Sequence, residues 1–278
     1  MILHRLRWFV HHLVGLGITA VFILPLFWVM VASLRMPGLP PPAQIEWWPP
    51  DPQFGNYPFI FELLPFGRYL VNSLIVVGTA VPLTLLTASL TGFALSQLPM
   101  RQQRHWFAFN VALLLIPGAS VWLFRFQILR WLGLLDSLWA LILPAFAASG
   151  PLFVLLYYWA CRQIPAELVE AARIDGAGLL RCWWQVVLPL AHPTTVAVTV
   201  LTFVLYWSDF ISPVLYIYRP IYYTLAVGLQ IMNQLDPTNW PLLMAAAVVM
   251  TLPVLLLFLW LQRYFLHDLS LANLMDKN

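Results

Sequence analysis

Long stretches of this chain contain no Asp, Glu, Lys or Arg. Among them are those between Arg68 and Arg101, between Asp136 and Arg162, and between Asp236 and Arg263. A helix needs about 20 apolar residues to cross about 30 Å of hydrocarbon, and each stretch is long enough to do so. Charged residues make up only 9% of the 278 residues, against roughly 25% in soluble domains. The sequence therefore predicts a protein that crosses a membrane several times.

We expect an all-α membrane protein with six transmembrane helices, because a backbone in lipid must satisfy its own hydrogen bonds. The expected spans are residues 10–34, 69–95, 106–131, 137–161, 194–215 and 242–264. Basic residues in short loops are more frequent on the cytosolic side, and this rule favours a cytosolic N-terminus and C-terminus. Residues 1–278 are expected to form a single transmembrane domain.

Composition and motifs argue against several other functions. The net charge of +3 comes from basic residues in loops beside apolar spans, so nucleic-acid binding is not expected. A P-loop needs a Gly-rich turn that ends in Lys-Ser or Lys-Thr, but the one lysine, Lys277, is followed by Asn278. ATP must then be bound by another polypeptide. Cys161 and Cys182 fall in one predicted cytosolic loop, where a disulfide is disfavoured, and two thiols make a poor metal site.

A Pro-rich segment follows the first predicted span, and residues 36–67 are expected to form an ordered external loop. Its prolines at positions 37, 40–42 and 49–50 favour extended backbone. Trp47 and Trp48 suit the membrane interface, where aromatic rings settle at headgroup depth.

The longest charged segment, residues 162–193, has the pattern of two helices joined by a turn. Residues 166–173 are mostly good helix formers, and Gly176 suits a left-handed helix cap. In the second helix, Leu180, Trp183, Trp184 and Val187 recur at helical spacing and are expected on one apolar face. We call this segment the 162–193 hairpin and expect it in the cytosol.

The chemistry of the 162–193 hairpin points to docking rather than catalysis. Ala171 and Ala172 are small, so another surface can approach the backbone closely, and Glu170 and Arg173 offer charges for pairing. A hairpin without any partner is the alternative.

Residues 170–177 read Glu-Ala-Ala-Arg-Ile-Asp-Gly-Ala, and residues 186–189 read Val-Val-Leu-Pro. This pattern resembles the EAA motif of ABC importer permeases, with Val186 where that family usually has Ile. In the family this loop is the coupling helix, which sits in a cleft of the ATP-binding subunit. The residues to which the resemblance gives an ATPase-coupling role are Glu170, Ala171, Ala172, Arg173, Asp175, Gly176 and Ala177.

Further segments extend the resemblance over most of the chain. Residues 68–74, 206–210, 224–229 and 261–265 are similar to motifs of carbohydrate permeases of the maltose-transporter type, specifically the shorter of its two transmembrane subunits. Ser208 stands where Asn is more usual. The resemblance implies the type I ABC importer permease fold and an inner (plasma) membrane location.

The resemblance also implies partners and substrates. The expected partners are a second permease subunit, two ATP-binding cassette subunits that hold ATP and Mg, and an external solute-binding protein. The substrate classes implied are sugars, oligosaccharides, glycosyl-polyols and glycerol phosphates. No cofactor and no metal are expected in this chain, and it is not expected to be an enzyme.

Asp209 is the only acidic residue placed inside a predicted span. An ionisable group within a membrane is a functional hypothesis by default, so Tyr206, Trp207 and Asp209 are candidates for the substrate pathway. The alternative is that Asp209 pairs with a neighbouring helix or caps a break near Pro213. Arg125 is expected to extend to water at the outer end of its span.

Two other functions compete with this interpretation. A stand-alone secondary transporter would leave the 162–193 hairpin unexplained. A membrane enzyme would need convergent ligands or nucleophiles, and the six histidines form no HExxH pair. The sequence does not identify the solute, and it leaves open whether the permease pair is a heterodimer, as we expect, or a homodimer.

Overall fold

The fold is known from a computed structural model that describes residues 2–44, 46–147 and 150–275, and all regular structure within these ranges is helical. The expected all-α fold is therefore confirmed. Four segments of the described chain are long and apolar enough to cross a membrane, namely Phe9–Ser33, Phe66–Ser96, Trp139–Gln163 and Trp240–Gln262. The number rises to six if each of two sharply bent helix pairs is counted as one span.

The third expected span, residues 106–131, is not one continuous helix. It is divided into α4 (Met100–Leu114) and α5 (Gly118–Trp131), which meet at an angle of 96°. Pro117 explains the break, because its ring excludes a helical hydrogen bond and disfavours helical backbone at Ile116. The expected span is therefore a bent pair of helices, and it counts as one span only if the pair is taken together.

The fifth expected span, residues 194–215, is also interrupted. Helix α11 (His192–Trp207) ends at Ser208, and the short helix α12 (Ile211–Tyr216) follows. Pro213 has no N–H to bond the carbonyl of Asp209, and its ring would clash with that carbonyl in a continuous helix. The helix therefore stops before Asp209 and restarts after Phe210.

The chain divides into two compact units. The first combines the residues up to Gly67 with Gly228–Pro253, and the second combines Arg68–Val227 with the residues from Val254 onward. The helices α13 (Leu225–Leu235) and α14 (Trp240–Met275) each contribute residues to both units.

The first unit contains α1 (Ile2–Ser33) and α2 (Asn56–Leu63), joined by the Pro-rich segment. Hydrogen bonds fix this segment at its start: the buried Asn56 amide donates to the carbonyls of Ser33 (2.7 Å) and Arg35 (2.9 Å). The Arg35 guanidinium, in turn, donates to the Glu46 carboxylate over 2.8 Å. Buried amide and charge-assisted bonds of this kind order a loop that has no regular structure.

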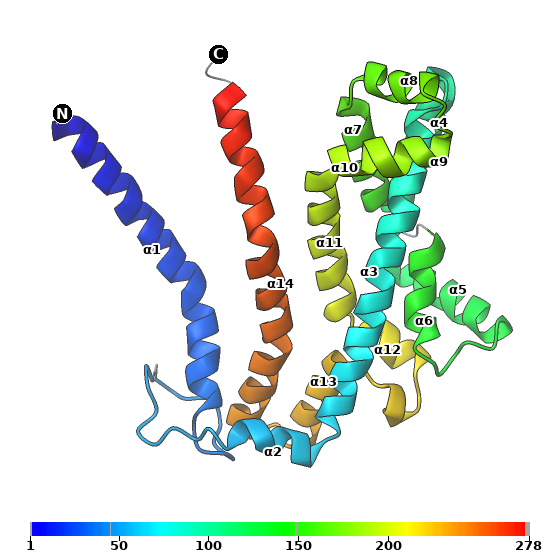
Figure 1. Cartoon of the computed structure of the whole chain (residues 1–278). Coiled ribbons are helices and arrows are strands. Elements are labelled where there is room, and N and C mark those ends of the chain that lie inside the picture. The colour runs from blue at the N-terminus through cyan, green and yellow to red at the C-terminus, as the bar shows by residue number, and fades with distance from the viewer. Residues whose placement is uncertain (1, 45, 148–149, 276–278) are drawn as a thin grey trace. The chain divides into compact units, whose positions relative to one another are not determined.

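The second unit is arranged along α3 (Phe66–Ser96), as Figure 1 shows. Helix α7 (Pro151–Gln163) packs closely on α3, since a Cβ atom at Gly92 would lie 2.6 Å from the Cβ of Tyr157. Small residues allow this close approach of membrane helices. At the other end of α3, the Asn72 amide donates to the carbonyls of Ile221 and Tyr223, each over 2.9 Å.

Short helical pieces complete the second unit. Between α5 and α7 lie α6 (Trp139–Ile142) and the 3₁₀ helix η1 (Leu143–Ala147), and after α12 lies the 3₁₀ helix η3 (Pro220–Tyr222). The loop before α6 is fixed by Asp136, whose carboxylate accepts hydrogen bonds from the backbone N–H groups of Arg219 (2.8 Å) and Tyr218 (3.0 Å) and pairs with the Arg219 guanidinium. The Arg219 N–H bond is the largest cause that lowers the pKa of Asp136 below its ordinary value.

Candidate functional site

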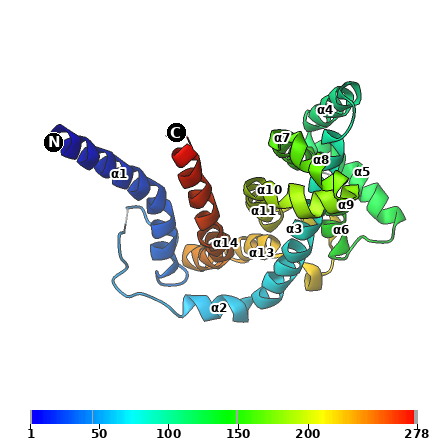
Figure 2. The ribbon, with the colours of Figure 1, turned by 45° about the horizontal axis from the view of Figure 1, so that its top comes forward.

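The 162–193 hairpin folds as helix, turn and helix, as predicted. Helix α8 (Ala166–Ile174) is followed by a turn, by α9 (Leu179–Cys182), by the π-helical turn η2 (Trp183–Val187) and by α10 (Leu188–Leu190). Within the second unit these elements gather at the end of α3 that carries Ser96, next to α4 and α7 (Figures 1 and 2).

A Schellman motif ends α8. Gly176 has φ +85°, its N–H donates to the Arg173 carbonyl (3.0 Å), and the Ala177 N–H donates to the Ala172 carbonyl (2.9 Å). This pair of bonds satisfies carbonyls that the helix end leaves free, and glycine takes the left-handed position without strain. The predicted left-handed cap at Gly176 is confirmed.

The buried side of the hairpin packs against α3. A cluster of buried side chains joins Phe93 of α3 to Val169, Cys182, Trp183 and Val187. Ala172 and Ala177 are half-buried against the same cluster. Both alanines therefore have a structural reason to be small, in addition to any contact with a partner.

The expected apolar face of the second helix was only partly right. Trp183 and Val187 are buried, but Leu180 and Trp184 are exposed. The π-helical turn covers Trp183–Val187, and its i→i+5 hydrogen bonds change the register of Trp184 relative to an α-helix. Leu180 lies before this turn, in α9.

The outer surface of the hairpin presents the motif residues to solvent. Glu170, Ala171, Arg173, Asp175 and Gly176 are all exposed. Beside them, the apolar side chain of Ile174 is 85% exposed. Ile174 was not singled out from the sequence, although its place inside the motif was a signal.

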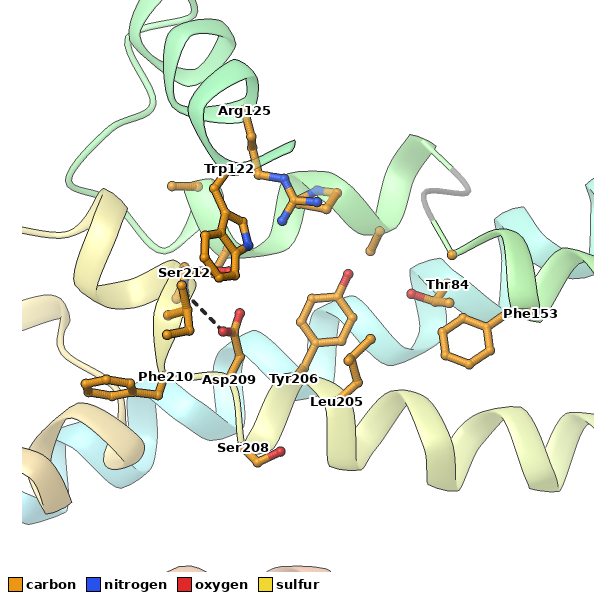
Figure 3. A pocket seen from close by; sticks show the side chains of 16 residues that line it. Thr84, Trp122, Arg125, Phe153, Leu205, Tyr206, Ser208, Asp209, Phe210 and Ser212 are labelled. Atoms are coloured by element: carbon orange, nitrogen blue, oxygen red, sulfur yellow. Dashed lines mark hydrogen bonds between the residues drawn. The ribbon is translucent and has the colours of Figure 1, made fainter. Parts of the chain in front are cut away.

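A second candidate site is a cavity of about 460 Å³ in the second unit, within the range of small-molecule sites. It is lined from α3 by Thr84, from α5 by Trp122 and Arg125, from α11 by Tyr206, and from the break after α11 by Asp209 (Figure 3). Thr84 lies 12 residues before Ser96 on α3, so the cavity and the hairpin are separated by about 18 Å along this helix.

Asp209 has a structural role at the helix break. Its Oδ1 accepts a hydrogen bond from the Ser212 N–H over 3.1 Å, which caps the start of α12. This is one of the alternatives considered from the sequence. The carboxylate also faces the cavity (Figure 3), so the cap and a role in the cavity are compatible.

Trp207 lies outside the residues that line the cavity, whereas Arg125 lines it together with Tyr206 and Asp209. Trp207 is 2% exposed, stacks on Phe203 with ring centroids 5.5 Å apart, and is not among the residues that line the cavity. Arg125 is half-buried, and its guanidinium points into the cavity. The bend at Pro117 gives α5 the direction that places Arg125 there. The expectation that it extends to water stays a prediction.

Comparisons with known proteins agree with the fold. Residues 2–270 match the family model described as "Binding-protein-dependent transport system inner membrane component". The chain is 30% identical over 250 residues to the sulfoquinovosyl glycerol transport system permease protein SmoH of Agrobacterium fabrum, covering 90% of this chain and 88% of that protein. It is also 30% identical over 249 residues to the melibiose/raffinose/stachyose import permease protein MelC of Bacillus subtilis, with 89% of each chain covered.

Further matches come from a curated relative and from solved structures. The sn-glycerol-3-phosphate transport system permease protein UgpE of Yersinia pestis is 33% identical over 211 residues, covering 74% of this chain and 73% of that protein. The crystal structure of a bacterial ABC transporter involved in the import of the acidic polysaccharide alginate contains a chain that matches with a TM-score of 0.76 and 21% identity, covering 94% of this chain and 97% of that one. These matches confirm the resemblance drawn from the sequence motifs, and the chain belongs to the family of inner membrane components of binding-protein-dependent transport systems.

Proposed function

We propose that this chain is one of two permease subunits of an ATP-driven importer in the inner (plasma) membrane and that its 162–193 hairpin couples it to a separate ATPase. The observation that carries this proposal is the exposed EAA-type helix, ended by a Schellman motif and held against α3 by a buried cluster. A rigid, protruding helix of this kind can transmit the motion of a partner into the packed helices beneath it.

The exposed part of the hairpin supplies the contact with the ATPase. Ala171 allows a close approach, Ile174 offers an apolar anchor, and Glu170 and Arg173 offer charges at the rim. An apolar centre with a charged rim is the usual composition of a specific interface. Asp175 and Gly176 form the exposed turn, while Ala172 and Ala177 support the helix from inside.

The proposed topology places the hairpin and both termini in the cytosol. It is supported by the bias of basic residues in the sequence. The Pro-rich segment of residues 36–67 then faces the outside, where a solute-binding protein would deliver the substrate.

The proposed assembly contains a second permease, two ATP-binding subunits and a solute-binding protein. In this proposal ATP and Mg are held by the ATP-binding subunits rather than by this chain. Family membership supports this assembly, and so does the match with a bacterial alginate ABC transporter in complex with its periplasmic protein, at a TM-score of 0.62 and 16% identity. A heterodimeric permease pair is our preferred arrangement.

The proposed substrate is a sugar, oligosaccharide, glycosyl-polyol or glycerol-phosphate-like solute. The named substrates of the relatives, among them melibiose, raffinose and sn-glycerol-3-phosphate, support this class. We propose that Tyr206 and Asp209 line the pathway, and that Trp207 supports α11 through its stack on Phe203.

Reconstitution tests the proposal. The chain, purified with its copurifying subunits and placed in liposomes with the cognate solute-binding protein, should take up labelled melibiose, raffinose or sn-glycerol-3-phosphate only when ATP is supplied. Uptake by this chain without any ATP-binding subunit would overturn the proposal in favour of a secondary transporter.

A further inference from the structure

The cavity of the second unit is lined by two side chains of opposite charge that form no ion pair with each other within the described residues. Arg125 and Asp209 both line it and are both half-buried. Within the described part of the chain, Arg125 donates no hydrogen bond and forms no ion pair, while Asp209 binds the Ser212 N–H. Charged side chains inside membrane proteins are costly, and they usually mark a pathway or carry a partner.

The geometry directs these groups toward a common space. In Figure 3 the Arg125 guanidinium enters from α5, and the Asp209 carboxylate and the Tyr206 hydroxyl enter from the opposite side. The Tyr216 hydroxyl donates to the Trp122 carbonyl over 3.1 Å, which ties α12 to the turn of α5 that precedes Arg125. The wall that carries the arginine is therefore fixed to the wall that carries the carboxylate, as a preorganised site requires.

We propose that this cavity is a solute site that selects a carbohydrate or polyol unit bearing an anionic group. Arg125 binds the carboxylate, phosphate or sulfonate of the solute, because a guanidinium offers a planar fork of donors that matches such groups. Asp209 accepts hydrogen bonds from hydroxyl groups, Tyr206 contributes a second polar contact, and the Trp122 indole covers the apolar face of the sugar. This inference rests on the proposed function, since it identifies the substrate class of the same permease.

The volume and the residue types agree with this assignment. About 460 Å³ is enough for one sugar unit and its substituent rather than for a long oligosaccharide. A neutral sugar would leave the half-buried Arg125 without a direct ion-pair partner, whereas an anionic one supplies it. Asp209 disfavours a solute that presents a second negative charge on its side of the cavity.

Direct binding to the purified complex tests the proposal without reliance on ATP hydrolysis. Isothermal titration would compare D-glucuronate with D-glucose, and sn-glycerol-3-phosphate with glycerol, so that each pair differs by one anionic group. We expect wild-type protein to bind at least one anionic probe about tenfold to a hundredfold more tightly than its neutral counterpart, as charge-assisted hydrogen bonds predict.

Variants of α5 identify the residue responsible. Arg125→Gln should remove the preference for the anionic probe, and Arg125→Lys should retain a part of it because it keeps the charge but loses the fork. Arg130→Gln, on the same helix but exposed and outside the cavity, is the matched control and should bind like wild type. If the Arg125→Gln complex does not assemble, the test compares wild type with Arg125→Lys, and the preference for the anionic over the neutral probe should be smaller in Arg125→Lys.

Three outcomes would overturn the proposal that the cavity binds an anionic solute. These are the absence of saturable binding of either anionic probe, equal affinity for anionic and neutral probes in wild type, or an unchanged preference in Arg125→Gln. Each can occur in a complex that still hydrolyses ATP in response to its solute-binding protein, so the proposed function would stand. Conversely, a complex that lacks coupled ATPase activity but shows the Arg125-dependent preference would overturn the proposed function and keep the anion site.

Discussion

Replacement of Gly176 tests whether the turn of the 162–193 hairpin matters for coupling. Proline at this position requires φ near −65°, about 150° away from the present +85°. It would also remove the Gly176 N–H bond and prevent the Ala177 N–H bond that complete the Schellman motif. Two such bonds are worth about 1 kcal/mol each, so the native turn should lose about 2 kcal/mol, or about 30-fold in its equilibrium constant against other conformations.

A graded series makes this prediction sharper. Gly176→Ala keeps both hydrogen bonds and meets no atom within 4 Å, so it should cost only about 1 kcal/mol for a left-handed alanine. Gly178→Ala is the control, because Gly178 has φ −68° and also has open space around its Cα. The expected order of coupling is therefore Gly178→Ala equal to wild type, then Gly176→Ala, then Gly176→Pro.

The assay is ATP-dependent solute uptake together with ATP hydrolysis stimulated by the solute-binding protein, measured in liposomes on complexes of verified subunit composition. We expect Gly176→Pro to lose at least about tenfold in uptake, as the worked population loss requires, while the chain remains in the membrane. Wild-type uptake in an assembled Gly176→Pro complex would refute the docking role of this turn.

Three further predictions concern the second unit. Asn72→Ala should lower stability by about 2 kcal/mol, because two backbone carbonyls lose their amide donor. Thermal unfolding in detergent measures this, and Thr79→Ala, which removes only an exposed hydrogen bond to the Ile75 carbonyl of the same helix, should leave the midpoint unchanged. Asp209→Asn should keep the hydrogen bond to the Ser212 N–H but reduce solute uptake. Asp209→Ala should reduce uptake and also lower the unfolding temperature, because it loses this hydrogen bond, worth about 1 kcal/mol. Identical uptake and identical unfolding temperatures of the two variants would contradict this prediction. The hydrogen bonds that Asp136 accepts lower the pKa of its carboxyl group in the folded protein. The carboxylate therefore stabilises the fold at pH values above its unfolded pKa of about 3.9, and this stabilisation is lost as the pH falls through its folded pKa. The stability difference between wild type and Asp136→Asn should therefore shrink below about pH 4, and a difference independent of pH would argue against it.

The sequence predicted the hairpin well because its signals are local. A glycine at a helix end, a run of helix formers before it and an apolar repeat after it depend only on near neighbours. The prediction failed at Leu180 and Trp184, which are exposed. Trp184 lies in a π-helical turn, whose register a 3.6-residue pattern does not contain.

The cavity was harder to predict because its residues come from distant parts of the chain. Tyr206 and Asp209 were found from a polar group within an apolar span. Arg125 was visible in the same way, but its direction depends on the 96° bend at Pro117, whose angle no local rule supplies. A straight helix would have placed it elsewhere.

Photo-crosslinking from Ile174 tests the central claim most directly. A benzoylphenylalanine in place of this 85% exposed residue should form an adduct with an ATP-binding subunit of the purified complex, and ATP should change its yield. The same probe at Leu115, which is 79% exposed and lies at the bend between α4 and α5, should give no such adduct. No adduct at Ile174, or an equal adduct at Leu115, would contradict the assignment of the 162–193 hairpin as the surface that couples this permease to its ATPase.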